Sequence, residues 1–235
     1  MGNNVIRLTE SDLNNLIRRV ILESKKETKS EIINKISSLK SVVEVNNYFD
    51  ELNNTYAPES KKLVLIFPGY GQYNIVAGMI YLSKINGYVF TSINDCINLI
   101  NKLSSKGKSY EQIYIGSHGG GREGLLYSID DKDNSSLLNG LVGSLAKITI
   151  PGKTKIIFSA CNAADSTGYF MKRIAELTNS YVYASEGTYD WVMNSSERGF
   201  WLCPPKPIMT DERISWTSKG YNLCKKVPSV PFGWS

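Results

Sequence analysis

The chain has 235 residues, of which 42% are hydrophobic and 21% charged, and its formal net charge is +5. These values are close to those of ordinary globular domains and exclude wholesale disorder, collagen-like repeats and a small protein packed around disulfides. No apolar run approaches the roughly 18 residues needed to cross a bilayer, so we expect no membrane partner. The small excess of lysine and arginine is scattered along the chain, and we therefore expect no nucleic-acid partner.

An amphipathic helix is predicted near the start of the chain, over residues 9–23. Its apolar residues recur every three or four positions, as on one face of a helix: Leu13, Leu16, Ile17, Val20 and Ile21. Such a face must be buried, either against the body of the same chain or against a partner. The charged stretch 24–29 is typical of a solvated linker, so both alternatives stay open. Residues 1–30 form this helix and linker, and the polar opening predicts no secretory signal.

Residues 31–60 carry a second helical pattern, which we expect to pack on the core of the molecule. From residue 61 short apolar runs alternate with helical patterns. Strands are predicted at 63–67, 88–90, 113–115, 155–158 and 181–184, and helices at 75–82, 93–103, 137–145 and 170–177. Continuous apolar strands between helices indicate an α/β fold, with a mostly parallel sheet covered by helices on both faces. We assign residues 61–235 to this domain, and after Trp191 an irregular segment either wraps the sheet or completes its edge.

Two reactive side chains follow predicted strands. His118, the single histidine in the sequence, follows the strand 113–115, and Cys161 follows the strand 155–158. Ligands of open α/β sheets bind at the carboxyl ends of strands, where a thiol and an imidazole would form a nucleophile and base pair. The backbone N–H groups of Gly119 and Cys161 are predicted to stabilise an oxyanion. We also expect Cys161 to lie just before the next helix, 170–177, whose N-terminus would favour a thiolate.

The other three cysteines have no predicted chemistry. Cys96 lies in an apolar helical pattern and is expected in the core. The sequence has no CxxC pair and a single histidine, so no metal site is predicted. Without a secretory signal, a disulfide between Cys203 and Cys224 is not expected.

The two strand-end motifs resemble those of the caspase-like cysteine peptidases, the superfamily of caspases, legumain, gingipains and clostripain. The likeness covers roughly residues 61–192. It is greatest to domains of unknown function at the ends of large bacterial adhesins and to the self-cleaving domains of large bacterial toxins. The segments that carry it are Ser117–Gly121, Gly124–Leu126, Phe158–Ala164, Gly168–Phe170, Ile174–Thr178 and Val182–Ser185.

The resemblance implies that His118 is the general base and Cys161 the nucleophile that forms an acyl-enzyme. It also implies that Ser159 lines the primary specificity pocket, where caspases, legumain and metacaspases carry Gln, Glu or Asp. Ser185, Glu186 and Asp190 follow the last predicted strand as further substrate-binding residues, and the two acids would restore acidity to that pocket. The toxin domains are switched on by inositol hexakisphosphate at a basic cluster. No comparable cluster is evident in this sequence, so no cofactor is expected.

The opening stretch Val5–Leu13 is similar to the start of uncharacterised tailed-phage proteins. Two functions are therefore predicted. The first is a cysteine endopeptidase that acts on a polypeptide substrate. In one form of this prediction the substrate is the chain itself. The second is a non-enzymatic structural or cargo protein of a phage particle, built on a caspase-like scaffold. In both, helix 9–23 would bind a phage or host protein, and the expected location is cytoplasmic, in the host or in a virion.

Overall fold

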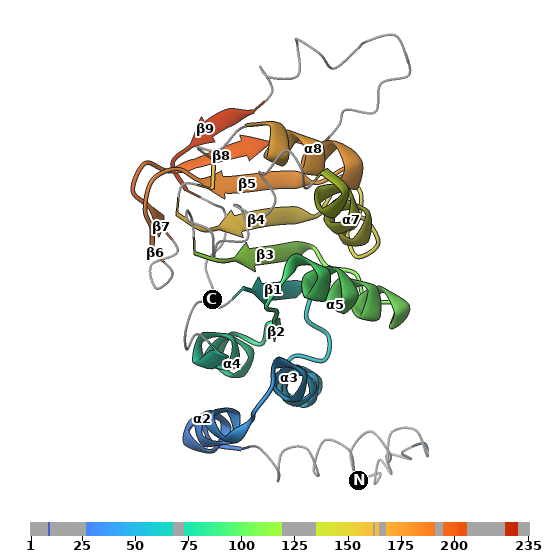
Figure 1. Ribbon diagram of the computed structural model, residues 1–235, viewed down its shortest axis with the longest axis vertical. Coiled ribbons are helices and arrows are strands. Elements are labelled where there is room, and N and C mark those ends of the chain that lie inside the picture. Colours follow the sequence, from blue (N-terminus) through green and yellow to red (C-terminus); the bar gives the residue numbers. More distant parts are fainter. Residues whose placement is uncertain are drawn as a thin grey trace, which may run out of the picture.

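The computed structural model describes residues 9, 27–67, 73–118, 135–161, 163–164, 168–190, 195–205 and 224–229. Helices and strands alternate through most of this range (Figure 1). The predictions for helix 9–23, apart from Thr9, and for Gly119 lie outside the described residues.

A seven-stranded sheet forms the centre of the described part of the chain, in the order β2-β1-β3-β4-β5-β8-β9. The first five strands of this order are parallel, and the last two are antiparallel to their neighbours. The strands are β1 (Lys62–Ile66), β2 (Asn86–Val89), β3 (Gln112–Gly116), β4 (Lys155–Ser159), β5 (Tyr181–Ser185), β8 (Phe200–Cys203) and β9 (Lys225–Val227). A short hairpin pairs β6 (Tyr189–Asp190) with β7 (Ser195–Ser196).

The helices of the domain lie on both faces of this sheet. They are α4 (Tyr73–Ser83), α5 (Ile93–Ser105), α7 (Ser135–Leu145) and α8 (Gly168–Thr178). The connection from β1 through α4 to β2 runs one way across the sheet, and the connections through α5, α7 and α8 run the other way. Because such parallel connections are right-handed, α4 lies on the face opposite α5, α7 and α8. The predicted α/β fold is confirmed, and its parallel strands are apolar because both of their faces are buried.

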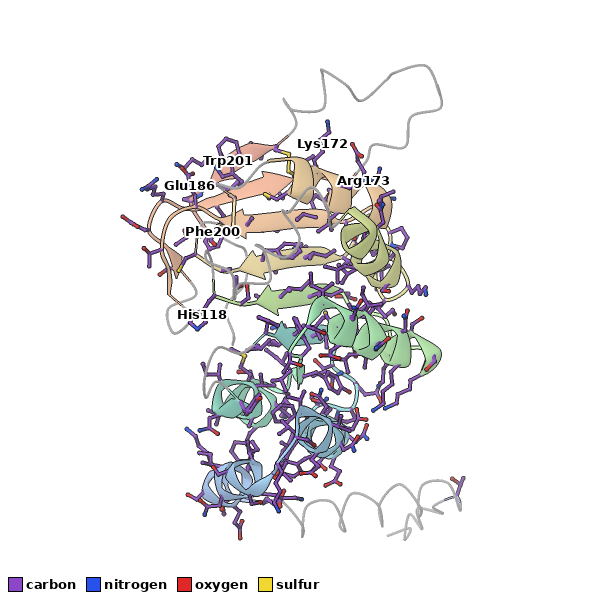
Figure 2. The ribbon with its side chains drawn as sticks, in the orientation of Figure 1. His118, Lys172, Arg173, Glu186, Phe200 and Trp201 are labelled. Atoms are coloured by element: carbon purple, nitrogen blue, oxygen red, sulfur yellow. A yellow bond between two sulfur atoms is a disulfide. The ribbon has the colours of Figure 1, made fainter. Side chains whose placement is uncertain are left out.

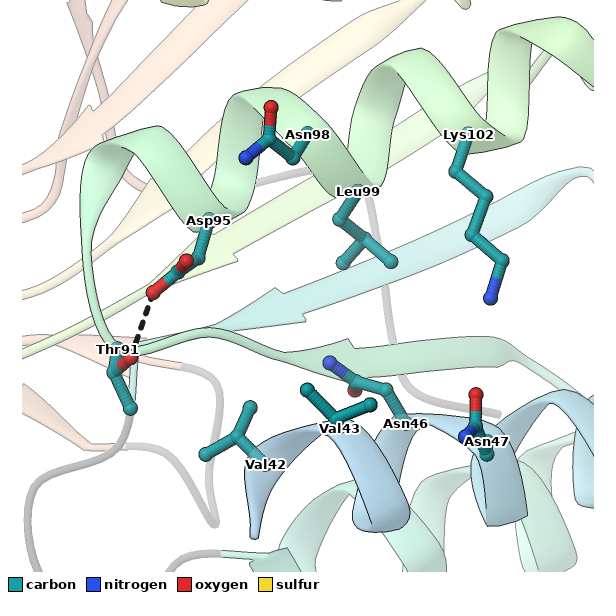
Figure 3. Close-up of a pocket in the computed structure, with 9 residues that line it drawn as sticks. All are labelled: Val42, Val43, Asn46, Asn47, Thr91, Asp95, Asn98, Leu99 and Lys102. Carbon is teal, nitrogen blue, oxygen red and sulfur yellow. Dashed lines mark hydrogen bonds between the residues drawn. The ribbon is translucent and has the colours of Figure 1, made fainter.

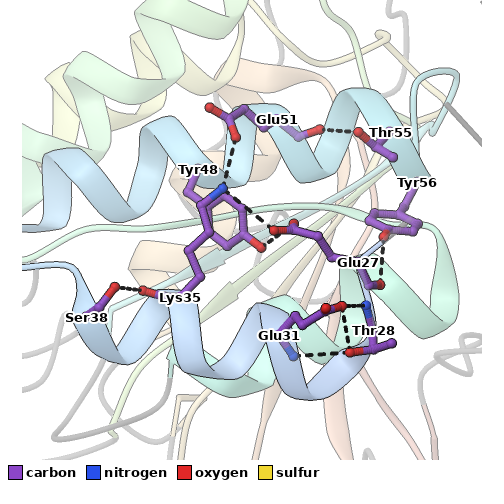
Figure 4. Close-up of polar contacts among 9 residues, drawn as sticks. All are labelled: Glu27, Thr28, Glu31, Lys35, Ser38, Tyr48, Glu51, Thr55 and Tyr56. Carbon is purple, nitrogen blue, oxygen red and sulfur yellow. Dashed lines mark hydrogen bonds and ion pairs between the residues drawn. The ribbon is translucent and has the colours of Figure 1, made fainter. Parts of the chain in front are cut away.

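Two helices precede the sheet, α2 (Lys29–Ser38) and α3 (Val42–Tyr56), and both pack against α4. A capping box begins α2, in which Thr28 and Glu31 each accept a hydrogen bond from the other's backbone N–H. Just before it, Glu27 is held on α3 (Figure 4). The Tyr48 hydroxyl donates to the Glu27 carboxylate at 2.7 Å, and the Tyr56 hydroxyl donates to its carbonyl at 3.0 Å. These contacts fix the position of Glu27 on α3.

Helix α3 also covers the β2 edge of the sheet. The Asn53 side chain accepts from the Gly87 N–H at 2.9 Å and donates to the Gly87 carbonyl at 3.3 Å. Asn46 makes the same pair of bonds with the backbone of Val89, at 2.9 and 2.7 Å. Two side-chain amides thus take the place of a neighbouring strand and satisfy backbone groups that an edge strand leaves open.

The segment after residue 191 completes the other edge of the sheet through β8 and β9. Here the expectation for two cysteines is wrong, because Cys203 and Cys224 form a disulfide. The strand register gives the physical reason. Leu202 pairs with Lys225, so the next residues outward, Cys203 and Cys224, lie directly opposite one another with their Cα atoms 4.2 Å apart. The expectation rested on the compartment of the chain and did not include this antiparallel pairing.

Candidate active site

The two predicted reactive residues follow neighbouring strands. β3 and β4 pair in parallel with Gly116 opposite Ser159, and the Ser117 N–H continues the ladder to the Ser159 carbonyl at 3.4 Å. His118 and Cys161 each lie two residues beyond that last pair. Neighbouring parallel strands are about 4.8 Å apart. His118 and Cys161 therefore lie at the same edge of the sheet and at the same level beyond two adjacent strands. We assumed from the sequence that these two strands are neighbours, and this is confirmed.

His118 also marks the point where the direction of the fold reverses. The chain leaves β1 toward β2 on one side, and leaves β3 toward β4 on the other side, so the connections diverge between β1 and β3. In open α/β sheets the crevice beyond the carboxyl ends of strands at such a switch point is the usual ligand site. Phe67, which follows β1, donates its N–H to the Gly116 carbonyl at 2.7 Å and keeps the two strand ends together. This second indication depends on strand order, so it was not available from the sequence.

The four cysteines differ in their access to solvent and in whether they form a disulfide. His118 is exposed at the carboxyl edge of the sheet (Figure 2), and Cys161 is half-buried and outside any disulfide. Cys96 is fully buried, as expected, and burial raises the pKa of its thiol. All four cysteines of the sequence lie within the described residues, and Cys161 is the one that combines a reduced sulfur with access to solvent. It is therefore the cysteine able to act as a nucleophile toward a bound substrate.

Cys161 lies in a tight turn that precedes helix α8. The Ala163 N–H donates to the Ala160 carbonyl at 3.3 Å, which closes a tight turn around Cys161. Helix α8 begins only at Gly168. Stabilisation of a thiolate by the N-terminus of α8 stays a prediction.

This turn is joined to the end of β5. The Ser185 hydroxyl donates to the Ala160 carbonyl, and the Ala164 N–H donates to the Ser185 carbonyl at 2.9 Å. Ser159 and Ser185 are both fully buried. The Ser159 hydroxyl has no hydrogen-bond partner among the described residues. A substrate-binding role for the two serines stays a prediction, and sequence reasoning missed the contact of Ser185 with Ala160 because no local pattern signals it.

Glu186 lies on the same edge of the sheet as His118 (Figure 2). Its carboxylate accepts from the Lys226 ammonium and from the Trp201 indole N–H, both at 2.9 Å. The Lys226 ammonium and then the Trp201 indole lower the pKa of the Glu186 carboxyl below its ordinary value. The Lys226 ammonium therefore already binds the Glu186 carboxylate, which was predicted to contact a substrate. Asp190 pairs through its backbone with Ser195 in the β6–β7 hairpin, and its side chain lies outside the described structure.

A separate cleft of about 330 Å³ lies between α3 and α5 (Figure 3). Several of its polar side chains are held by contacts within the fold. Asn46 binds the backbone of β2, Asp95 caps α5 through Thr91 and Ser92, and Lys102 pairs with Asp50. We therefore place the candidate active site at the ends of β3 and β4.

The described residues hold no cluster of three or more metal-ligating side chains. In the same part of the chain, no helix combines the length and the apolar character needed to cross a membrane. Comparisons of the chain with models of known protein families, with curated proteins and with solved structures found no match.

Proposed function

We propose that this chain is a caspase-like cysteine endopeptidase in which Cys161 is the nucleophile and His118 the general base. The observation that carries the proposal is the parallel register of β3 and β4, with His118 and Cys161 each two residues beyond the pair Gly116 and Ser159. The switch point beside His118 and the solvent access of both side chains support it. A thiol and an imidazole at one strand edge are the minimum needed for nucleophilic catalysis.

The proposed reaction proceeds through an acyl-enzyme. An imidazole nitrogen of His118 takes the proton of the Cys161 thiol, and the sulfur attacks the carbonyl carbon of the substrate peptide bond. The C–S bond forms, the C–N bond then breaks, and the imidazolium gives its proton to the departing amine. Water, deprotonated by the same imidazole, attacks the thioester, releases the carboxylic acid and restores the thiol. Backbone N–H groups near Cys161 and Gly119 would hold the negative oxygen.

Cleavage of a fluorogenic peptide library by the full chain tests the proposal. We expect wild type to cleave, and Cys161→Ala and His118→Asn to lose about a thousandfold or more in kcat/KM. Self-cleavage, followed by intact mass, should disappear in the same variants. The matched control is Cys203→Ser with Cys224→Ser, which removes the two cysteines at the other end of β5, where Cys203 pairs with Val182. This double variant should keep cleaving.

Alkylation with iodoacetamide gives an answer that needs no substrate. If His118 activates the thiol, Cys161 should react more slowly in His118→Asn than in wild type at pH 7, because only the thiolate is nucleophilic. Equal rates in the two proteins, or cleavage that survives Cys161→Ala, would sink the proposal.

A further inference from the structure

Ser185 makes a contact that the sheet itself does not need. The pairing of β4 with β5 ends at Phe158 opposite Ala184, so Ser185 lies beyond the last pair of these two strands, while its backbone still pairs with Phe200 of β8. There it binds both ends of the turn that holds Cys161: its hydroxyl donates to the Ala160 carbonyl, and its own carbonyl accepts the Ala164 N–H. Ser185 is fully buried, so water does not compete for these bonds.

The planar peptide group between Ala160 and Cys161 links this contact to the backbone of Cys161. The Ala160 carbonyl and the Cys161 N–H belong to the same planar, trans peptide group, and they point in opposite directions. Holding the carbonyl toward Ser185 therefore fixes the orientation of the Cys161 backbone, with its N–H directed away from the Ser185 hydroxyl. β5 borders β4 on one side, and β3, which leads to His118, borders it on the other.

We propose that Ser185 is a positioning residue for Cys161, which holds the nucleophile toward β3 through the Ala160–Cys161 peptide group. Its consequence for cleavage rests on the proposed peptidase function. Its consequence for the reactivity of the Cys161 thiol does not, because that requires only that the turn keeps the sulfur beside His118.

Ser180 supplies a matched control. It lies just before β5, at the other end of the same strand, and is also fully buried. Its hydroxyl also donates to a backbone carbonyl, that of Thr178, at 3.2 Å. Loss of either hydroxyl removes one buried hydrogen bond, so Ser180→Ala and Ser185→Ala should both lower the melting temperature. Only the second change should reach Cys161.

The experiment measures iodoacetamide alkylation of Cys161 in the full chain at pH 7, without reductant, by mass spectrometry. We expect Ser185→Ala to slow alkylation by about tenfold, because the sulfur leaves the imidazole and the thiolate fraction falls. Ser180→Ala should react like wild type. A rate in Ser185→Ala equal to or above that of wild type would overturn the proposal, as would an equal slowing in Ser180→Ala.

A second pair of variants covers the case in which Ser185→Ala does not fold. Ser185→Thr and Ser185→Val have the same shape and differ only in the hydroxyl, with far-UV circular dichroism as the check on folding. Threonine should preserve the alkylation rate and valine should slow it, and equal rates would overturn the proposal.

Peptide cleavage then separates the two proposals. In an active enzyme, Ser185→Ala should lower kcat by about tenfold to a hundredfold and leave KM unchanged. If wild type cleaves nothing while Ser185→Ala still slows alkylation, the peptidase proposal fails and the positioning role stands. If wild type cleaves and Ser185→Ala matches it in kcat and in alkylation, the positioning role fails alone.

Discussion

Asp50 is the residue at which three elements meet. It lies on α3 and accepts hydrogen bonds from the Tyr88 hydroxyl of β2 at 2.5 Å, from Lys102 of α5 at 2.9 Å and from Lys106, directly after α5, at 3.1 Å. Partial burial acts to raise the pKa of the carboxyl. The hydrogen bonds from Tyr88 and the two lysines outweigh burial, so the pKa lies below its ordinary value. The folded state therefore binds this proton less readily than the unfolded state does.

The sign of the pH dependence follows from that difference. A lowered pKa stabilises the fold above the unfolded value near pH 4, and this stability is lost as the pH falls through the folded pKa. Asp50→Asn should cost about 1 kcal/mol at pH 7 and have almost no effect near pH 2, as measured by urea unfolding at both pH values. Glu51→Gln is the control, since Glu51 is exposed and makes one contact at 3.4 Å to Lys35. A pH-independent effect of Asp50→Asn would contradict this account.

The contacts of single side chains were the hardest feature to predict from the sequence. Ser185 and Glu186 were predicted as substrate contacts from their place after a strand. In the structure Ser185 binds the Ala160 carbonyl and Glu186 binds Lys226, a residue 40 positions later in the printed sequence. Both contacts depend on which strands adjoin, and no local pattern encodes that. His118 and Cys161 could be selected from the sequence because their chemistry and their strand-end positions are local properties.

At the scale of elements, the pairing of α3 with β2 gives a direct test. Asn53 is buried, and its amide serves both backbone groups of Gly87. Asn53→Leu keeps the size of the side chain but leaves a buried N–H and carbonyl without partners, so we expect a loss of about 2–3 kcal/mol in the free energy of unfolding. The neighbouring Asn54 is exposed, and Asn54→Leu should change stability by less than about 0.5 kcal/mol. Urea unfolding measures both, and equal losses would argue against this role of the Asn53 amide.

The strands β1, β3, β4 and β5 were predicted well because burial on both faces makes each of them a mostly apolar run, whereas β2 begins with Asn86 and Gly87. The runs at β1, β3, β4 and β5 were found within one or two residues of their observed bounds. Strand order was beyond reach, since a helical connection can cross the sheet in either direction. The helix predicted at 170–177 lies within two residues of the observed bounds of α8, Gly168–Thr178, whereas the antiparallel pair β8 and β9 was left within an irregular segment.

At the scale of the whole molecule, the contacts of Glu27 and Thr28 with α2 and α3 give a prediction for the residues that precede them. The capping box at Thr28 and the tyrosine contacts to Glu27 do not involve residues 1–24. Deletion of residues 1–24 should therefore change the melting temperature by less than about 2 °C. A much larger fall would mean that the predicted apolar face of helix 9–23 is part of the core.

The same truncation tests the predicted role in a phage particle. If helix 9–23 is a docking element, the truncated chain should fold and fail to enter particles in a complementation assay. Normal incorporation would remove the support for a virion role and leave the peptidase proposal untouched.

The oxidation states of the cysteines decide in which solution conditions the proposed enzyme can be studied. The chain holds one bonded pair, Cys203 and Cys224, and a half-buried cysteine outside that pair, Cys161, so one polypeptide carries cysteine in two oxidation states. Strong reductants that protect the thiol from oxygen would also open the bonded pair, which joins β8 to the residue before β9. Because Cys203→Ser with Cys224→Ser is expected to keep cleaving, a strong reductant should lower the melting temperature and leave cleavage in place, whereas oxidation of Cys161 should abolish cleavage.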